Sequence, residues 1–244
     1  MTIGSKPLRL GLRLAALFQG SLKTFPQFAE VVRDRSGLEI GGPSKPFREA
    51  PLPIYDLVKS LDNCNYSAST IWSQHIGSYR FSDRRPPGKN LISDATDLSS
   101  VKGPYDFILS SHNLEHIANP LKALLEWKRI SPDLILIVPD GSRTFDRFRP
   151  ITSVEHMLED YTRGCTEEDA THFEEVIALH DVKWGFHGNR AELEKSVRNN
   201  FNIRTIHHHV FNEQNIRELL ILARAKVKVV ERAFPHHICV LAEW

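Results

Sequence analysis

The sequence predicts an α/β domain built on a mostly parallel, doubly wound sheet. Short apolar runs alternate with helical segments from Gly37 onward, and a polar or glycine residue follows each run. The chain has 244 residues, which is enough for one such domain with an insertion. Ligands of these sheets bind at the carboxyl ends of the strands, so the residues that follow each run are the candidate site residues.

The parallel strands are predicted from the apolar runs, in order along the chain. These runs cover residues 38–40, 58–61, 91–92, 105–109 and 134–138. The last run is continuously apolar, as expected of a strand buried on both faces. A helix is predicted to begin at Asn119 and Pro120 and to run towards Arg129, because Asn is a favoured N-cap residue and Pro fits the first helical position.

The C-terminal part predicts a helix over residues 212–225, followed by strands at 227–230 and 238–241. The short connection between these two strands predicts an antiparallel pair at the end of the sheet. Residues 140–211 instead form a long polar, helix-rich stretch, with helices predicted at 152–161 and 166–179. Connections in compact α/β domains usually have about 2–6 residues, so we interpret 140–211 as a lid or substrate-recognition insertion.

The N-terminal segment has a helical apolar stripe over residues 8–23. We expect residues 1–36 to form a helical segment packed on the main domain, which spans residues 37–244. Weak contact of this helix with a membrane surface is the alternative interpretation. Arg9 and Arg13 interrupt the apolar stretch that a signal peptide needs, and no apolar run approaches the roughly 20 residues of a membrane span.

Composition excludes several classes of protein. The chain has 31 Lys and Arg against 30 Asp and Glu, so it lacks the excess positive charge of a protein that coats nucleic acid. Its 3 cysteines are far apart and have neither disulfide nor metal-ligand spacing. We therefore expect a cytoplasmic protein without a nucleic-acid partner, and nothing in the sequence indicates its oligomeric state.

Acidic residues and glycines at the predicted strand ends indicate a nucleoside ligand. Glu39 precedes Gly41 and Gly42, whose missing side chains allow a ligand to approach the backbone closely. The turn lacks the third glycine of the dinucleotide fingerprint and the Gly-Lys-Ser/Thr of a phosphate loop. Asp62 follows about 20 residues later, where a carboxylate can hold a ribose diol, and Asp94 can accept a hydrogen bond from a base. Together they predict a nucleoside without a polyphosphate.

Three segments resemble the motifs of class I S-adenosylmethionine-dependent methyltransferases. They are Glu-Ile-Gly-Gly-Pro at 39–43, Asp-Ala-Thr at 94–96, and residues 105–116, which are similar to the His-x-Leu-Glu-His signature of the small-molecule branch. The resemblance covers residues 37–139 and extends to the unit from about 212. It implies a Rossmann-like sheet of seven strands, mostly parallel with an antiparallel C-terminal strand. The departure is Gly-Gly-Pro-Ser in place of Gly-x-Gly-x-Gly.

The resemblance also implies S-adenosylmethionine as the cofactor. Glu39 would stand near its amino-acid end, Asp62 would hold the ribose and Asp94 the adenine. The residues implied to bind the cofactor are Glu39, Gly41, Gly42, Ser44, Asp62, Asp94, Ala95 and Ser111.

Histidine, aspartate and arginine residues near the fourth and fifth strand ends predict a polar methyl acceptor, such as a sugar or glycan hydroxyl. A hydroxyl acceptor needs a base, and an imidazole or a carboxylate can serve. The candidate catalytic residues are His112, Asp140 and His116, and the candidate acceptor-binding residues are Arg143, His156 and His172. The run from Pro139 to Asp146 resembles bacterial methyltransferases associated with polysaccharide synthesis.

Two other functions remain open from the sequence. The irregular glycine turn is also compatible with a binding module that has the fold without catalysis, and the histidines with a metal-dependent hydrolase. His112 and His116 are four residues apart and could share a zinc ion, but the protease motif requires Glu where this chain has Asn113. The histidines at 207–209 and 236–237 are adjacent and alternate faces, so we interpret them as surface or strand residues and expect no metal site.

Overall fold

The structure is a computed structural model that describes residues 22–72, 74, 77–185 and 188–244. The helix predicted at residues 8–23 lies outside this part of the chain, apart from Leu22 and Lys23. The described chain starts with α2 (Phe25–Val32), which leads into the first strand of the sheet.

One mixed sheet of eight strands organises the described chain. Its order is β3 (Ser78–Tyr79), β4 (Gly88–Ile92), β2 (Ser60–Asn65), β1 (Ser36–Ile40), β5 (Phe107–Ser111), β6 (Asp133–Pro139), β8 (His237–Glu243) and β7 (Lys226–Ala233). The strands from β4 to β6 are parallel, whereas β3, β8 and β7 each pair antiparallel to a neighbour. The predicted fold class is therefore confirmed, and the two-residue β3 is added to the seven predicted strands.

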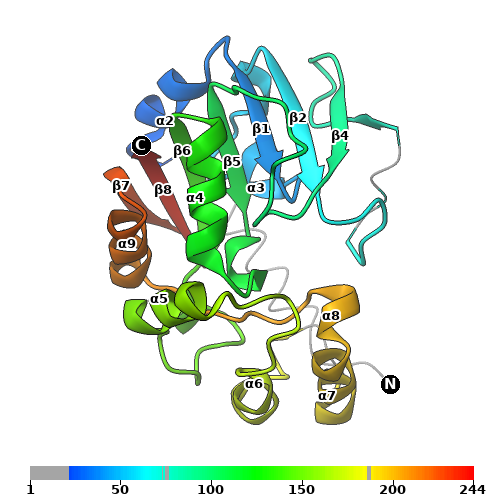
Figure 1. Ribbon diagram of the computed structural model, residues 1–244. Helices are drawn as coiled ribbons and strands as arrows, with labels where there is room; N and C mark the ends of the chain where they lie inside the picture. The colour runs from blue at the N-terminus through cyan, green and yellow to red at the C-terminus, as the bar shows by residue number, and fades with distance from the viewer. Residues whose placement is uncertain (1–21, 73, 75–76, 186–187) are drawn as a thin grey trace.

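Helices cover both faces of the sheet, and the alternation of side chains along β6 explains why. Leu134, Leu136 and Val138 pack into the core under α4 (Pro120–Ile130) and α9 (Glu213–Leu222), the helices on the near face in Figure 1. Ile135 and Ile137 point to the other core, which contains residues of α2, α3 (Lys45–Arg48) and η1 (Tyr55–Leu57). A strand buried on both faces needs the continuous apolar run seen in the sequence.

The insertion after β6 forms a helical layer beyond the carboxyl ends of the parallel strands (Figure 1). It contains η3 (Gly141–Arg143), α5 (Val154–Arg163), α6 (Phe173–Leu179), α7 (Arg190–Arg198) and α8 (Asn200–Ile203). Its own small apolar core contains Val176, Leu193, Val197 and Ile206. Across the ranges that the structure describes, none of the helices has the length and apolarity needed to cross a membrane.

Two predicted elements are wrong in their bounds. The second strand was expected at 58–61 but is Ser60–Asn65, so Asp62 lies within it and Asn65 at its end. The helix expected at 166–179 begins only at Phe173. Thr166 starts a turn instead, because the Glu167 carboxylate is directed inward and accepts a hydrogen bond from the Ala118 amide at 3.2 Å. The remaining short helix η2 (Leu114–His116) follows β5.

Candidate functional site

The turn after β1 is tightly packed. Gly41 has φ +83°, a conformation that glycine adopts without strain, and the Gly42 amide donates a hydrogen bond to Oδ1 of buried Asn63 at 3.0 Å. A Cβ atom on Gly42 would lie 2.5 Å from Cδ of Glu39 and would also collide with the Tyr79 hydroxyl. Both glycines are therefore required by the shape of this turn.

Glu39 stabilises this turn from the interior of the protein. Its carboxylate is fully buried and accepts hydrogen bonds from the hydroxyls of Tyr55, at 2.7 Å, and Tyr79. The Tyr55 hydroxyl in turn accepts a hydrogen bond from the Ser44 amide at 2.7 Å. Burial raises the pKa of Glu39, against the effect of these hydrogen bonds. Its polar contacts are satisfied inside the protein, and Glu39 does not line the adjoining cavity.

A cavity of about 1890 Å³ lies at the carboxyl ends of the strands. Pockets for one small ligand usually measure about 300–1,000 Å³, so this space accommodates two small molecules at once. The strand ends and the turns after them contribute Gly41, Ser44, Asn65, Tyr66, Ser93, Ala95 and Ser111. The insertion and the β7–β8 connection contribute Arg143, Phe145, Lys183, Trp184, His207, His236 and His237.

Several buried polar atoms at the β5 end of this cavity lack hydrogen-bond partners within the described part of the chain. They are Oγ of Ser111, Nδ2 of Asn113 and both carboxylate oxygens of Glu115. All three residues line the cavity. A buried polar group without a partner costs about 1–3 kcal/mol, so these atoms favour a polar ligand that would satisfy them.

His112 lines the cavity beside these unpartnered atoms. It follows β5 with φ +50°, which is rare for a residue with a side chain and is a kind of strain that gathers at functional sites. Its Nδ1 lies 3.6 Å from Oε1 of fully buried Glu115, and its Nε2 lies 2.7 Å from Nδ1 of His237. The carboxylate orients the imidazole, and His237 occupies the other ring nitrogen.

The charges around Glu115 keep it ionised. Burial alone would raise the pKa of Glu115, but the neighbouring imidazoles of His112, His116 and His207 lower it below its usual value. Burial has the opposite effect on His116 and lowers its pKa to about 4, assisted by His207. The Nδ1 of His116 hydrogen-bonds to the Ile206 carbonyl at 2.9 Å. His116 is therefore neutral at neutral pH, with one nitrogen already engaged.

The two carboxylates predicted to hold the nucleoside do not line the cavity. Asp62 accepts hydrogen bonds from the Lys89 amide, at 2.8 Å, and the Tyr105 hydroxyl, at 3.0 Å. Asp94 forms an ion pair with Arg204 at 2.8 Å. Burial alone would raise the pKa of Asp94, but hydrogen bonds from Thr96 and Arg204 outweigh it and lower the pKa.

Arg204 links the insertion to the strand ends. Its guanidinium lies 4.1 Å from the centre of the Tyr66 ring, and both residues line the cavity. Asp94 therefore acts on the cavity by holding this arginine, and the neighbouring Ala95 lines the cavity itself.

Asp140 also lies beside the cavity rather than in its wall. Its Oδ1 caps η3 by accepting hydrogen bonds from the amide and hydroxyl of Ser142, at 3.1 and 2.7 Å. Its Oδ2 forms ion pairs with Arg232, at 3.2 Å, and Arg143, at 3.8 Å. Arg143 itself lines the cavity and is half exposed, so a ligand can reach its guanidinium.

The structure thus divides the predicted site residues into two groups. Those that line the cavity are Gly41, Ser44, Ala95, Ser111, His112, His116 and Arg143. Those that do not are Glu39, Gly42, Asp62, Asp94, Asp140, His156 and His172. His156 and His172 lie together elsewhere in the insertion, where their Nε2 atoms are 2.9 Å apart.

The interpretation of the adjacent histidines as surface residues is wrong. His207, His208 and His209 are all buried, and His236 and His237 line the cavity beside His112. His207 joins Glu115 and His116, whereas His209, two residues further on, joins a different group, and the adjacent His236 and His237 both lie beside His112. Period-two alternation therefore does not describe these segments, and spacing in the sequence could not have sorted their histidines.

Comparison with known proteins finds distant similarity to solved structures. No family model matches the chain, and no curated protein matches its sequence. Similar structures include an S-adenosylmethionine-dependent methyltransferase from Aquifex aeolicus, with 13% identity over 89% of this chain and 86% of that chain, and a TM-score of 0.46. Another is a magnesium protoporphyrin IX methyltransferase from Synechocystis PCC 6803 with bound S-adenosylmethionine. It has 8% identity over 97% of this chain and 79% of that chain, and a TM-score of 0.46.

A third similar structure is a complex of the Haloferax volcanii Trm112 methyltransferase activator with a methyltransferase. It has 12% identity, coverage of 98% of this chain and 94% of that chain, and a TM-score of 0.47. All these identities are low, so the function of this chain is inferred from the cavity and the residues that line it.

Proposed function

We propose that the protein is an S-adenosylmethionine-dependent methyltransferase that methylates a hydroxyl group of a polar small molecule or sugar. The observation that carries the proposal is the cavity of about 1890 Å³ at the carboxyl ends of β1, β2, β4 and β5. Ligands of doubly wound sheets bind at this edge, and the volume is sufficient for a cofactor together with an acceptor.

The residues on the strand-end side fit a nucleoside. Gly41 allows close approach at the end of β1, and Asn65, at the end of β2, offers an amide to a ribose. Ala95 follows β4, where its backbone can contact a base, and the unpartnered Ser111 hydroxyl offers a further hydrogen bond. S-adenosylmethionine bound there would supply a methyl group on a sulfonium, which is already activated for transfer. Positioning of the two reactants can then contribute about 7–11 kcal/mol to catalysis.

We assign the role of general base to His112. It lines the cavity, and the buried Glu115 carboxylate holds its Nδ1 side. The acceptor hydroxyl would take the place of His237 as the hydrogen-bond partner of Nε2 and donate its proton there. Asp140 and His116 are weaker candidates: the carboxylate is engaged by Ser142 and two arginines, and burial lowers the pKa of His116 to about 4.

The insertion side supports a sugar-like acceptor. Arg143 and Lys183 offer hydrogen-bond donors, while Trp72 and Trp184 line the cavity with half-exposed rings. A sugar has hydroxyls for the donors and an apolar ring face for an aromatic side chain. This combination favours a polyhydroxylated acceptor over a purely apolar one.

A methyl-transfer screen tests this function. The purified chain would be incubated with methyl-labelled S-adenosylmethionine and panels of free sugars, nucleotide sugars and small phenols. The proposal expects transfer to at least one sugar panel and its loss in His112→Ala. Transfer confined to phenols would refute the acceptor class, and cofactor binding without transfer to any panel would favour a binding module with this fold.

A further inference from the structure

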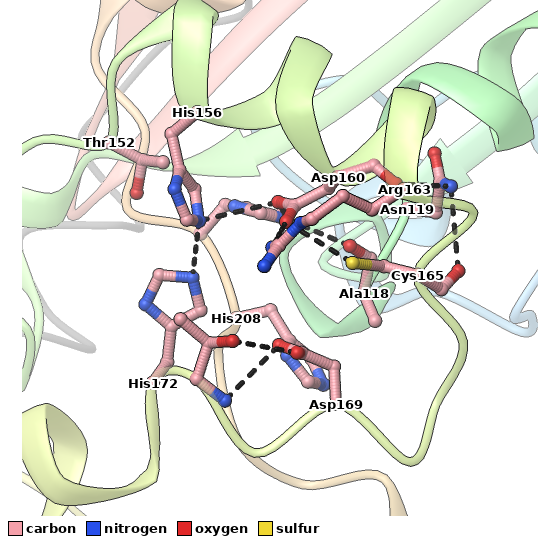
Figure 2. Close-up of polar contacts among 12 residues, drawn as sticks. Ala118, Asn119, Thr152, His156, Asp160, Arg163, Cys165, Asp169, His172 and His208 are labelled. Carbon is pink, nitrogen blue, oxygen red and sulfur yellow. Dashed lines mark hydrogen bonds and ion pairs between the residues drawn. The ribbon is translucent and has the colours of Figure 1, made fainter.

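A second cluster of histidines lies in the insertion, away from the cavity. His156 and Asp160 are one turn apart on α5, His172 precedes α6, and His209 follows α8. One nitrogen of each imidazole and one oxygen of Asp160 lie within 4.8 Å of one another. Figure 2 shows a contact between the ring nitrogens of His156 and His172. None of the four residues lines the cavity.

The distances in this cluster match the edges of a tetrahedral metal site. Nε2 of His156 lies 2.9 Å from Nε2 of His172 and 3.3 Å from Oδ2 of Asp160, and Nε2 of His209 lies 3.8 Å from the same oxygen. Zinc binds nitrogen and oxygen ligands at about 2.0–2.1 Å, so the ligands at the corners of a tetrahedron are about 3.3 Å apart. These three separations bracket that value, and all four atoms lie within 4.8 Å of one another, so side-chain shifts would place them around one ion. Nε2 of His209 would then leave the Ala118 carbonyl, which lies 3.3 Å from it.

The Asp160 carboxylate is already oriented for such an ion. Its Oδ1 is held by Arg163, at 2.6 Å, and by the Cys165 thiol, at 3.4 Å (Figure 2). Its Oδ2 is buried and has no hydrogen-bond donor within the described ranges of the chain, although two imidazoles face it. The Asp160 side chain is only 2% exposed, so water cannot compensate this oxygen. A bound cation would compensate the charge on this oxygen.

The donor set selects the kind of ion. Three imidazoles and one carboxylate suit zinc and related transition metals, whereas magnesium and calcium prefer oxygen ligands alone. The side chain of His156 is 25% exposed, which provides a path for an ion to enter.

We propose that His156, Asp160, His172 and His209 bind one zinc-class divalent ion. Four protein ligands leave no open coordination position, so the ion is structural rather than catalytic. It would fasten α5, the turn before α6 and the segment after α8 to one another, and so fix the helical layer that closes the cavity.

Metal titration of the chain purified without a histidine tag tests the proposal. After treatment with a chelator, calorimetry with Zn²⁺ should give one tight site per chain, and Zn²⁺ should raise the Tm. Co²⁺ should produce the visible absorption of a four-coordinate ion. His172→Gln should weaken Zn²⁺ binding by more than about 100-fold, beyond the loss caused by removing an outer-shell partner.

Two further variants keep the test decisive. His236→Ala removes one of the histidines that line the cavity and should leave the tight Zn²⁺ site intact. Loss of Zn²⁺ binding in this variant alone would place the metal in the cavity and overturn the proposal. His156→Cys keeps a ligand and should add a sulfur-to-cobalt charge-transfer band in the near ultraviolet. Absence of a tight site in the wild-type chain would also overturn it, leaving His156 and Asp160 as a simple ion pair.

Discussion

Arg149 anchors the segment that carries the buried histidines, which makes its partner Asp146 a sensitive position. The Arg149 side chain is 0% exposed and forms ion pairs with Asp146, at 2.9 Å, and Glu175, at 2.7 Å. It also donates hydrogen bonds to the carbonyls of His207, at 2.8 Å, and His208, at 3.3 Å. Asp146 in turn lies 2.5 Å from Nδ1 of His207. Removing this carboxylate leaves buried His207 without its main counter-charge and takes one of two carboxylates from buried Arg149.

We expect Asp146→Asn to lower the free energy of unfolding by about 3 kcal/mol. Breaking a buried ion pair costs about 3–5 kcal/mol, and Glu175 and the two carbonyls remain with Arg149, which favours the lower end. Urea unfolding followed by circular dichroism measures the change. Glu49→Gln is the control, because its ion pair with Lys45 is exposed and should contribute no more than about 0.5 kcal/mol. A loss below 1 kcal/mol in Asp146→Asn would refute this account of the network.

The same pair predicts how stability depends on pH. Burial alone would raise the pKa of Asp146, but His207 and Arg149 hold it well below its usual range, so its contribution is lost as the pH falls below about 4. Burial alone would lower the pKa of His207, but Asp146 raises it, so that contribution is complete below about pH 6.5 and is lost as the pH rises through the raised pKa. Asp146→Asn should therefore make the free energy of unfolding depend less on pH, both below about pH 4 and above about pH 6.5.

Three substitutions test the cavity. His112→Ala should lower kcat by about 10²–10⁴-fold with unchanged affinity for S-adenosylhomocysteine; normal turnover would remove its role as base. Asp94→Ala should weaken that affinity in calorimetry by about 1–3 kcal/mol, because Arg204 loses its partner beside the cavity, and an unchanged affinity would show that the Asp94–Arg204 pair does not support the cofactor site. Gly42→Ala should cost about 1–3 kcal/mol in urea unfolding, since its Cβ would meet buried Glu39; an unaffected midpoint would show that this turn can relax.

The fold was predictable because its strongest signals are local. The apolar run at 134–138 lies inside β6, and Asn119 accepts a hydrogen bond from the Lys122 amide as the predicted cap of α4. The extent of β2 was not predictable in the same way. Asp62 and Asn63 look like loop residues in the sequence, yet Asn63 is buried and bonds to the turn after β1. This polar sequence forms a strand because its backbone pairs in parallel with β1 and β4.

The site was predictable only in its position at the strand edge. Ser111, His112 and Glu115 lie together at the end of β5, whereas His207 and His237, which lie beside Glu115 and His112, come from far along the chain. Likewise, His156 and His172 lie away from the cavity because of how the turn before α6 packs against α5 within the insertion. Sequence spacing does not encode such tertiary juxtapositions, so residues of the insertion could not be assigned to one site or another.

Calorimetric titration of the purified chain with S-adenosylmethionine and S-adenosylhomocysteine tests the central claim most directly. The account predicts one site per chain with a micromolar dissociation constant for both compounds. It also predicts a large loss of affinity in Gly41→Val, whose backbone would be forced from φ +83° and whose side chain would meet Asn113 and the cavity. Absence of micromolar binding to both compounds by a folded wild-type chain would contradict the assignment of this cavity to the cofactor.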